Sequence, residues 1–301
     1  MSAATERSEQ RPASRTHNSR RTALLAECSI EISPRDEFAG DALRRLLQPG
    51  ATVFVNHPST VTHHDIVAAC ARLRRAGFDP VPHVAARRLA SFTQASDFLQ
   101  RAVGEAAVER ILLIGGDDSP AGPFRASLDL LATGVVERHG VGHVSFGGYP
   151  EGHPAIDDRA LDAALQAKVT LARQAGLAVS VVTQFSFEAA PILRWIAAQR
   201  AQGIDCPVHV GIAGPASVAT LAKFAIRCGI GASLRALARG HTSFARILVE
   251  AEPDALIDDL VASEPPEDPI GGLHLFTFGG MRRSAEWIRS RAPTVSPAFR
   301  E

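Results

Sequence analysis

The 301-residue chain has few cysteines and no long apolar run, and both absences narrow its class. Cys28, Cys70, Cys206 and Cys228 lie far apart, with no C-x-x-C pair and no disulfide-like spacing. We therefore expect buried thiols and a cytoplasmic protein. No segment holds about 18 consecutive apolar residues, so the sequence predicts no transmembrane helix.

The chain also lacks net charge. Lys and Arg total 32, as do Asp and Glu, so nothing indicates a nucleic-acid or acidic-membrane partner. The opening MSAATERSEQRPASRTHNSRR has no apolar stretch, which excludes a secretory signal; a transit peptide is the less favoured alternative. We predict a disordered tail over residues 1–22 and one catalytic domain over residues 23–295, a length that can bury its own core.

Several site motifs are missing as well. No G-x-G-x-x-G follows the first apolar run and no Walker sequence occurs, which disfavours a Rossmann-type sheet. The stretch NHPSTVTHH offers His57, His63 and His64, but H-x-H and H-E-x-x-H pairs are absent. We expect no metal site, and we place His63 and His64 in the first exposed turn of a helix.

What is present is an alternation of strands and helices. Between the strands lie helical segments such as residues 62–77, where Thr62 and Asp65 form a potential capping box, and residues 158–176. The interval from Gly211 to Gly271 is about twice the usual one. We expect ASVATLAKFAIRCG there to be the seventh helix, followed by one or two extra helices. The sequence thus predicts a (β/α)8 TIM barrel with extra helices between strands 7 and 8, whose strands are AECSIEI, ATVFVN, DPVPHV, RILLIG, HVSFGG, AVSVVTQ, CPVHVGI and GLHLFTF.

Carboxylates stand where two of the predicted strands end, and in such barrels the C-terminal strand ends carry the active site. Asp117 and Asp118 follow the fourth strand directly; alternatively, Asp117 caps a helix and Asp118 faces solvent. Glu31 lies between Ile30 and Ile32, so it points into the barrel mouth or is buried at high cost. We expect burial to raise its pKa, which suits a general acid.

Other strands end in polar residues too. For His83 and His153 a hydrogen-bonded structural histidine is the alternative to a site residue. Together, however, these residues favour an active site. A structural or protein-interaction role would leave a rim of polar residues at the strand ends unexplained. The remaining members are Asn56, His57, Tyr149 and Gln184.

The order of these motifs resembles that of a known family. SIEISP, VPHVAA, IGGDDSP, YPEGHP, VTQFSFE and HLFTF, over about residues 26–290, resemble the catalytic barrel of methylenetetrahydrofolate reductases, a flavoprotein family. The resemblance implies an enzyme that interconverts 5,10-methylenetetrahydrofolate and 5-methyltetrahydrofolate with FAD and NAD(P)H. It also implies assembly into a homo-oligomer. It does not fix NADH against NADPH, or the direction in which the reaction runs.

The resemblance also implies roles for individual residues. Glu31 matches the family's general acid, and Asp117 matches the aspartate whose charge tunes flavin and pterin. Gln184 and Phe224 match residues that contact the folate, Phe224 alternatively packing on the nicotinamide. Cofactor-binding positions are matched by Asn56, His83, Ile114, Gly115, Gly116, Tyr149, His153 and Lys168.

Two departures concern the flavin's phosphates. Gly115 stands where the family usually has a basic residue. On the helix after the fifth strand, where the family carries basic side chains, the matching turn reads LARQAG, and the nearest cations, Lys168 and Arg173, are displaced in register. The alternative is therefore a flavin-free relative. Such a protein reduces folate directly from NAD(P)H, or serves as a folate-binding or methyl-transfer protein.

Overall fold

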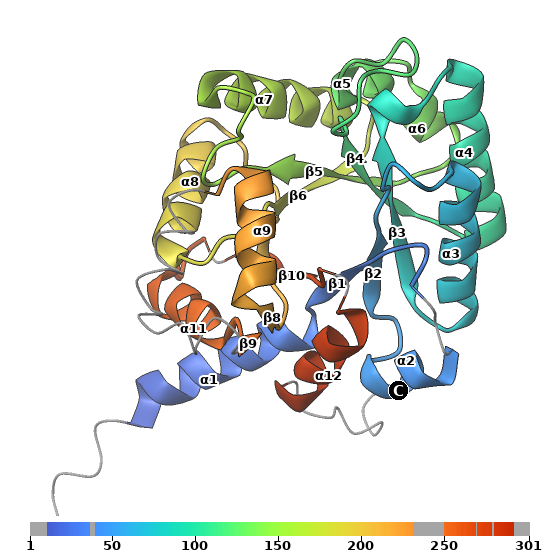
Figure 1. Ribbon diagram of the computed structural model, residues 1–301. Coiled ribbons are helices and arrows are strands. Elements are labelled where there is room, and N and C mark those ends of the chain that lie inside the picture. The colour runs from blue at the N-terminus through green and yellow to red at the C-terminus, as the bar shows by residue number, and fades with distance from the viewer. Residues whose placement is uncertain (1–10, 37–39, 231–249, 269, 279, 292–301) are drawn as a thin grey trace, which may run out of the picture.

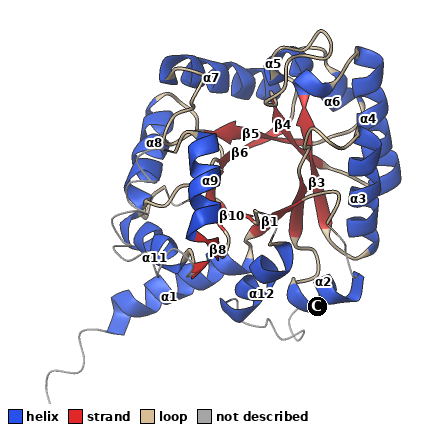
Figure 2. Ribbon diagram, in the orientation of Figure 1, coloured by secondary structure: helices blue, strands red, loops and turns tan. Residues whose placement is uncertain are grey.

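A closed barrel of parallel strands forms the centre of the protein (Figures 1 and 2). The computed structural model describes residues 11–36, 40–230, 250–268, 270–278 and 280–291. The predicted eight-stranded (β/α)8 barrel is confirmed. Its strands, in spatial order, are β1 (Ser29–Ile32), β10 (Gly272–Phe276), β7 (Val208–Ala213), β6 (Ala178–Thr183), β5 (His143–Gly148), β4 (Arg110–Ile114), β3 (Asp79–Ala85) and β2 (Thr52–Val55).

Helices surround the barrel, and a short antiparallel pair, β8 (Ala216–Ser217) and β9 (Glu250–Ala251), lies outside it. Within the described ranges, no helix is long and apolar enough to cross a membrane. The helices are α1 (Arg11–Ala26), α2 (Gly40–Leu46), α3 (His63–Arg75), the 3-10 turn η1 (Ala86–Arg88), α4 (Phe92–Ala106), α5 (Ser127–Leu131), α6 (Val135–Arg138), α7 (Asp158–Gln174), α8 (Ala189–Ala201), α9 (Val218–Cys228), α11 (Asp254–Ser263) and α12 (Met281–Arg291).

Helix α3 shows how local sequence sets an element. Thr62 caps it, accepting a bond from the Asp65 backbone N–H while the Asp65 carboxylate accepts from that of Thr62. Ile66 and Cys70 lie on its buried face, and Gly77, at φ +85°, follows its end. These features confirm the prediction for residues 62–77.

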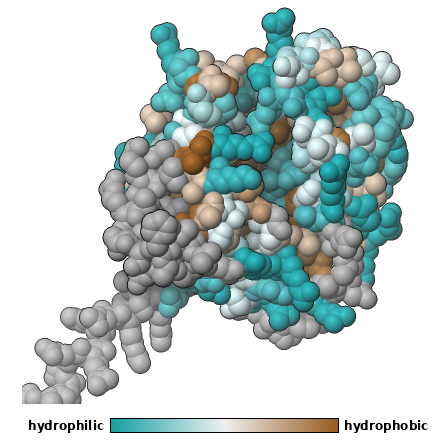
Figure 3. Space-filling model, in the orientation of Figure 1, coloured by the Kyte–Doolittle hydropathy of each residue, from teal (hydrophilic) through white to brown (hydrophobic). Residues whose placement is uncertain are grey.

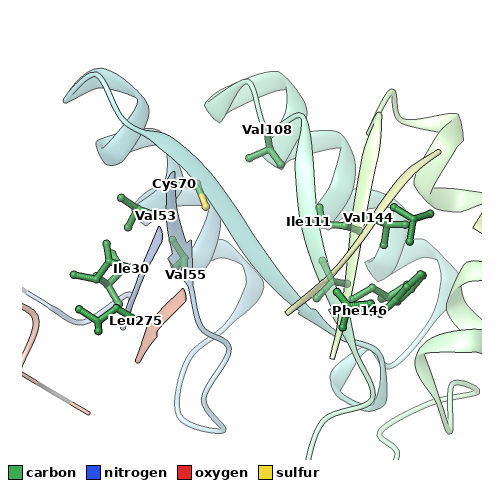
Figure 4. Close-up of a cluster of buried hydrophobic side chains, with 14 of the residues drawn as sticks. Ile30, Val53, Val55, Cys70, Val108, Ile111, Val144, Phe146 and Leu275 are labelled. Atoms are coloured by element: carbon green, nitrogen blue, oxygen red, sulfur yellow. The ribbon is translucent and has the colours of Figure 1, made fainter. Parts of the chain in front are cut away.

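The main core lies between the barrel and the helices, because alternate strand residues point outward. Ile30 and Ile32 are buried there, whereas Glu31 between them faces the interior. Each fully buried side chain of this size stabilises the fold by about 1.5–3 kcal/mol. Figure 4 shows part of this core, including Ile30, Val53, Val55, Cys70, Val108, Ile111, Val144, Phe146 and Leu275.

The barrel interior is less apolar than the outer core. Phe54 packs edge-on against the rings of His83 and His274, with centroids 6.0 and 4.6 Å apart. Lower in the barrel, His143 Nε2 lies 2.8 Å from the Ser180 hydroxyl. The interior therefore combines a small apolar group, Phe54, Val81, Leu112 and Val182, with the imidazoles of His83, His143, His209 and His274.

These imidazoles predict acid lability. Burial lowers the pKa of His83 and of His209 to about 4, from an ordinary 6.5. Between about pH 6.5 and 4 the unfolded chain therefore binds protons that the folded chain does not, so stability falls as the pH falls. Urea unfolding at several pH values measures the slope, to which each group adds up to about 1.4 kcal/mol per pH unit. A slope that His209→Gln leaves unchanged contradicts this assignment.

The N-terminal segment corrects one expectation. Residues 11–26 form α1, although residues 1–22 were predicted to be disordered; residues 1–10 lie outside the described part. Arg20 pairs with Glu264, its Nε 2.7 Å from Oε1, and Arg21 pairs with Asp254 and Asp258 of α11. The helix depends on these partners far away in sequence, which its polar composition could not indicate.

The positions of the helices after β7 also differ from the sequence-based expectation. Helix α9, predicted as the seventh helix of the ring, lies in front of the barrel opening, and α11 packs beside α8 and α1 in the ring (Figure 1). The reason is the apolar face of α9, which packs on residues at the strand ends, including Phe185 and Ala213. Helix α11 falls in the segment predicted to hold one or two extra helices, and residues 231–249 of that segment lie outside the described residues.

Candidate active site

Glu31 of β1 is the centre of a polar cluster at the barrel mouth. Its Oε1 accepts a hydrogen bond from Asn56 Nδ2 at 3.2 Å. Its Oε2 lies 3.5 Å from Nε2 of His83 and 3.7 Å from Nε2 of His274. The structure thus brings together three predicted site residues, Glu31, Asn56 and His83, which are 25 and 27 positions apart along the chain.

His274 completes this cluster, and sequence reasoning missed it. It is fully buried on β10, and its Nδ1 lies 2.9 Å from the hydroxyl of Ser29. Ser29 precedes Glu31 by two residues on β1, so both point into the barrel. The signal was the alternation in GLHLFTF, which puts His274 and Phe276 on one face.

The electrostatics of Glu31 differ from the expectation. Burial by itself raises the pKa of the carboxyl, but the imidazoles of His83 and His274 and the Asn56 amide outweigh burial. The pKa of Glu31 therefore lies below its ordinary value, not above it. Glu31 is a carboxylate at neutral pH, and a proton that it delivers must first reach it.

Asp117 lies in solvent at the same end of the barrel. Its side chain is 85% exposed, and its Oδ2 lies 3.4 Å from Arg227 of α9. The neighbouring Asp118 is half exposed and lies 3.4 Å from Arg88. The alternative that Asp117 caps a helix is wrong, because α5 begins only at Ser127 and uses Asp129 in its first turn.

The end of β4 leaves room beside Asp117. Gly116 has φ +92°, a conformation that favours glycine, and a Cβ there would lie 3.3 Å from Ala85. A Cβ on Gly115 meets nothing within 4 Å. Ile114 at the strand end packs on the apolar group inside the barrel. This strand end can therefore accept a flat ligand against its backbone.

Tyr149 and His153 pack on each other after β5, with ring centroids 5.3 Å apart and planes nearly perpendicular. Burial raises the pKa of Tyr149, and the nearby Asp117 and Cys228 raise it further. Cys228 at the end of α9 is in turn within electrostatic range of Glu31. Helix α9 therefore brings its C-terminal end close to the polar cluster.

Gln184 follows β6, where its backbone N–H donates to Gly148 O at 2.7 Å. Its side-chain Oε1 accepts from the backbone N–H of Phe185 at 3.2 Å. Phe224 of α9 stacks at 4.5 Å on Phe278, which in turn contacts Phe276 and Phe185. These rings form an apolar wall of the mouth that the sequence indicated only through Phe224.

Lys168 does not join this group. It lies on α7 with Nζ 5.3 Å from the ring centre of Phe146, a residue of the core outside the barrel. Burial lowers its pKa to about 8. Its place on the inner face of the helix thus directs the ammonium at the sheet.

In the space-filling view of the same face, the surface is mostly hydrophilic, and hydrophobic residues show only in small separate areas (Figure 3). On the coloured part of this face, the view in Figure 3 shows no broad apolar patch of the kind that is typical of a protein interface.

Comparisons with known proteins agree with this architecture. A model of the methylenetetrahydrofolate reductase family matches residues 43–234. Among solved structures, an uncharacterized protein from Clostridium thermocellum that binds two copies of 5-methyl-5,6,7,8-tetrahydrofolic acid has a TM-score of 0.56 and 11% identity, covering 87% of this chain and 94% of that chain. A dihydropteroate synthase from Thermus thermophilus has a TM-score of 0.49 and 16% identity, covering 88% and 95%. At such identities the first likeness shows the barrel fold alone.

Proposed function

Because this chain belongs to the methylenetetrahydrofolate reductase family, we propose that it binds a reduced folate at the barrel mouth and interconverts 5,10-methylenetetrahydrofolate and 5-methyltetrahydrofolate with NAD(P)H. The observation that carries the proposal is the cluster around Glu31. Among the described residues, three buried polar atoms there have no hydrogen-bond partner, namely Asn56 Oδ1, His83 Nε2 and His274 Nε2, although both Nε2 atoms lie near Glu31 Oε2, at 3.5 and 3.7 Å. Buried polar atoms are rarely left unpaired unless a ligand or water pairs with them.

The chemistry of the substrate explains why such a cluster is needed. The five-membered ring of methylenetetrahydrofolate opens when its bridging nitrogen takes a proton, and the methylene carbon then becomes part of a cationic 5-iminium group. That carbon accepts a hydride and becomes the methyl group, while the nicotinamide is oxidised. The site must therefore supply one proton and stabilise one positive charge.

Glu31 suits both tasks. As a carboxylate with a lowered pKa it attracts the cation, and its partial burial makes the attraction stronger than in water. The proton comes from solvent, and the neutral imidazole of His83 relays it by taking a proton at one nitrogen and releasing one from Nε2, 3.5 Å from Glu31 Oε2. Ser29, at 2.9 Å from His274 Nδ1, orients that imidazole.

The aromatic wall and Gln184 position the folate in this proposal. Phe224 offers its ring on the side of α9, and the pterin and the benzoate rings of a folate are flat groups that stack on such rings. The Gln184 amide, held by its backbone bond to Gly148, offers a donor and an acceptor. Both residues are substrate-binding residues of the proposed site.

The residues at the barrel mouth fit the ring system of a flavin better than its pyrophosphate. The open side of Gly115 and the pair of Tyr149 and His153 accommodate the ring system. Two described cations that could hold the pyrophosphate are engaged elsewhere: the Lys168 ammonium lies on Phe146, and Arg88 donates to the carbonyls of His57 and Val61. Among the described residues, FAD therefore does not find these two cations for its pyrophosphate, and we derive no step through it.

This mismatch favours a second candidate function within the same site. Hydride passes directly from NAD(P)H to the folate, because a co-substrate that leaves after each turnover does not need the tight phosphate grip of a resident cofactor. Folate-dependent oxidation of NAD(P)H, measured anaerobically with and without added FAD, separates the candidates. Turnover that needs FAD supports the flavin enzyme; turnover without FAD supports direct transfer. No turnover under either condition contradicts both.

Asp117 has a smaller predicted effect than Glu31. Its carboxylate is exposed in the free protein, so its charge is screened by water until a ligand covers it. We expect Asp117→Asn to weaken folate binding about 10-fold, the worth of about one hydrogen bond to a charged group. Equilibrium titration with 5-methyltetrahydrofolate measures this, with Asp118→Asn as control. Equal affinities for both variants and the wild type remove Asp117 from the site.

A further inference from the structure

A second cluster of metal-ligating side chains lies on the outside of the barrel, between α3 and α4. His63 and His64 begin α3, and Asp97 lies in the first half of α4. One ligand atom from each of the three residues lies within 4.8 Å of the other two. The two imidazole rings stack with centroids 4.0 Å apart, tilted by 38°. We propose that His63, His64 and Asp97 form a binding site for a divalent transition-metal ion such as Zn²⁺.

The geometry of the cluster suits such an ion. His63 Nε2 and Asp97 Oδ2 are 3.1 Å apart, close to the roughly 3.4 Å between two ligand atoms that each lie about 2.1 Å from a tetrahedral zinc ion. Imidazole nitrogen with one carboxylate favours Zn²⁺, Co²⁺ or Ni²⁺ over Mg²⁺ and Ca²⁺, which prefer oxygen ligands. Three protein ligands leave a fourth position open to water.

The second nitrogen of His63 is already oriented. Gln94, one turn before Asp97, places its side-chain nitrogen 3.3 Å from His63 Nδ1. The Gln94 amide nitrogen is a donor, since Gln94 Oε1 accepts from the Ala90 N–H, so Nδ1 accepts here and Nε2 carries the proton towards Asp97. When an ion binds at Nε2, the proton moves to Nδ1 and the Gln94 amide turns so that its oxygen accepts from Nδ1–H. His63 is buried and Asp97 is half exposed, so an ion can enter from solvent on the side of His64 and Asp97.

The surrounding charge is more negative than positive. The carboxylates of Asp65 and Glu105 lie within electrostatic range of His64, in addition to Asp97 in the cluster itself. Two guanidinium groups oppose them: Arg35 acts on Asp65, and Arg101 contacts His64 Nδ1 and also pairs with Glu105 at 2.6 Å. Arg101 therefore competes with a metal ion for His64 and moves to Glu105 alone when the ion binds.

The site is separate from the barrel mouth but touches the loop that leads there. The ring of Phe98 lies 5.7 Å from His63 and 6.1 Å from His57, which follows Asn56 after β2. A metal ion that joins α3 to α4 fixes the start of α3 next to this loop. Its main expected effect is a higher thermal stability of the folded chain, because the ion binds the folded state alone.

Metal titration of the tag-free, chelator-treated full chain tests the site. We expect one equivalent of Zn²⁺ in calorimetry, and Co²⁺ to give the visible bands of a four-coordinate N/O site. His64→Ala removes an exposed ligand and is expected to weaken Zn²⁺ binding more than about 100-fold, since even outer partners of metal ligands are worth about 10- to 100-fold. Asp97→Asn tests the third ligand should His64→Ala alter folding.

Two further variants make the test specific. Arg101→Ala removes the competing cation, so it is expected to tighten Zn²⁺ binding several-fold. His17→Ala, which removes a partly exposed histidine of α1 far from the cluster in sequence, is expected to leave Zn²⁺ binding unchanged. The proposal is overturned if the wild type binds no Zn²⁺ or Co²⁺, or if His64→Ala and Asp97→Asn both bind Zn²⁺ as the wild type does. Folate binding is measured separately and does not decide this outcome.

Discussion

Glu31→Gln is expected to lower folate turnover by about 10²-fold or more while leaving the fold intact. The substitution keeps the shape of the side chain and an oxygen that can accept from Asn56, but it removes both the charge and the ability to carry a proton. Loss of a general acid or base typically costs about 10²–10⁴-fold. Steady-state folate-dependent NAD(P)H oxidation gives the measurement.

The control for this variant is Glu27→Gln, which changes an exposed acid four residues earlier and is expected to keep full activity. Binding of 5-methyltetrahydrofolate by Glu31→Gln is expected to change far less than turnover, because the aromatic wall and Gln184 remain. A turnover number within a factor of three of the wild type removes Glu31 from the chemistry. If FAD supports turnover, reduction of FAD by NAD(P)H should survive the substitution.

Gly211→Ala is expected to combine a loss of stability with a loss of folate affinity. Gly211 lies on β7 against the end of β6, where a Cβ meets the Thr183 carbonyl oxygen first, and also Phe276 Cε2 at 2.8 Å and the Gln184 carbonyl carbon at 2.9 Å. Phe276 and Gln184 belong to the site. Backbone cannot yield as a flexible side chain can, so overpacking here costs about 1–3 kcal/mol and displaces Gln184.

Thermal unfolding and folate titration of the same preparation measure both effects of Gly211→Ala. We expect Tm to fall by several degrees and folate affinity to fall about 10-fold. Gly104→Ala in α4 is the matched control: a Cβ there meets nothing within 4 Å, and alanine in a helix interior stabilises by about 0.5–1 kcal/mol. Unchanged stability and affinity in Gly211→Ala contradict the close approach of these strands.

The barrel was predictable because each strand is a short apolar run, and turn-forming or polar residues next to it in the sequence mark where it ends. Helix α3 was predictable to its caps, since Thr62, Asp65 and Gly77 act through neighbours along the chain. Helix α1 was not, because Arg20 and Arg21 gain partners more than 230 positions away. For α9 the sequence indicated a helix but not its place, which depends on phenylalanines from other strand ends.

The sequence indicated which residues form the cluster around Glu31 better than it indicated their electrostatics. Glu31 was identified from its apolar neighbours, and the predicted Asn56 and His83 lie beside it. The direction of its pKa was wrong, because His83 of β3, His274 of the last strand and Asn56 together outweigh the effect of burial. Likewise, the contact of Arg227 with Asp117, which the sequence did not indicate, depends on where α9 lies. Both the wrong pKa direction and the missed contact concern distances between residues remote in sequence, which composition and periodicity do not encode.

Binding of a reduced folate at the barrel mouth is the central claim, and an anaerobic equilibrium titration with 5-methyltetrahydrofolate tests it most directly. We predict saturable binding by the wild type that Gln184→Ala and Phe224→Ala each weaken about 10-fold or more, whereas Glu27→Gln does not alter it. Absence of binding by the wild type, or the same affinity in all four proteins, contradicts the claim that this mouth is a folate site.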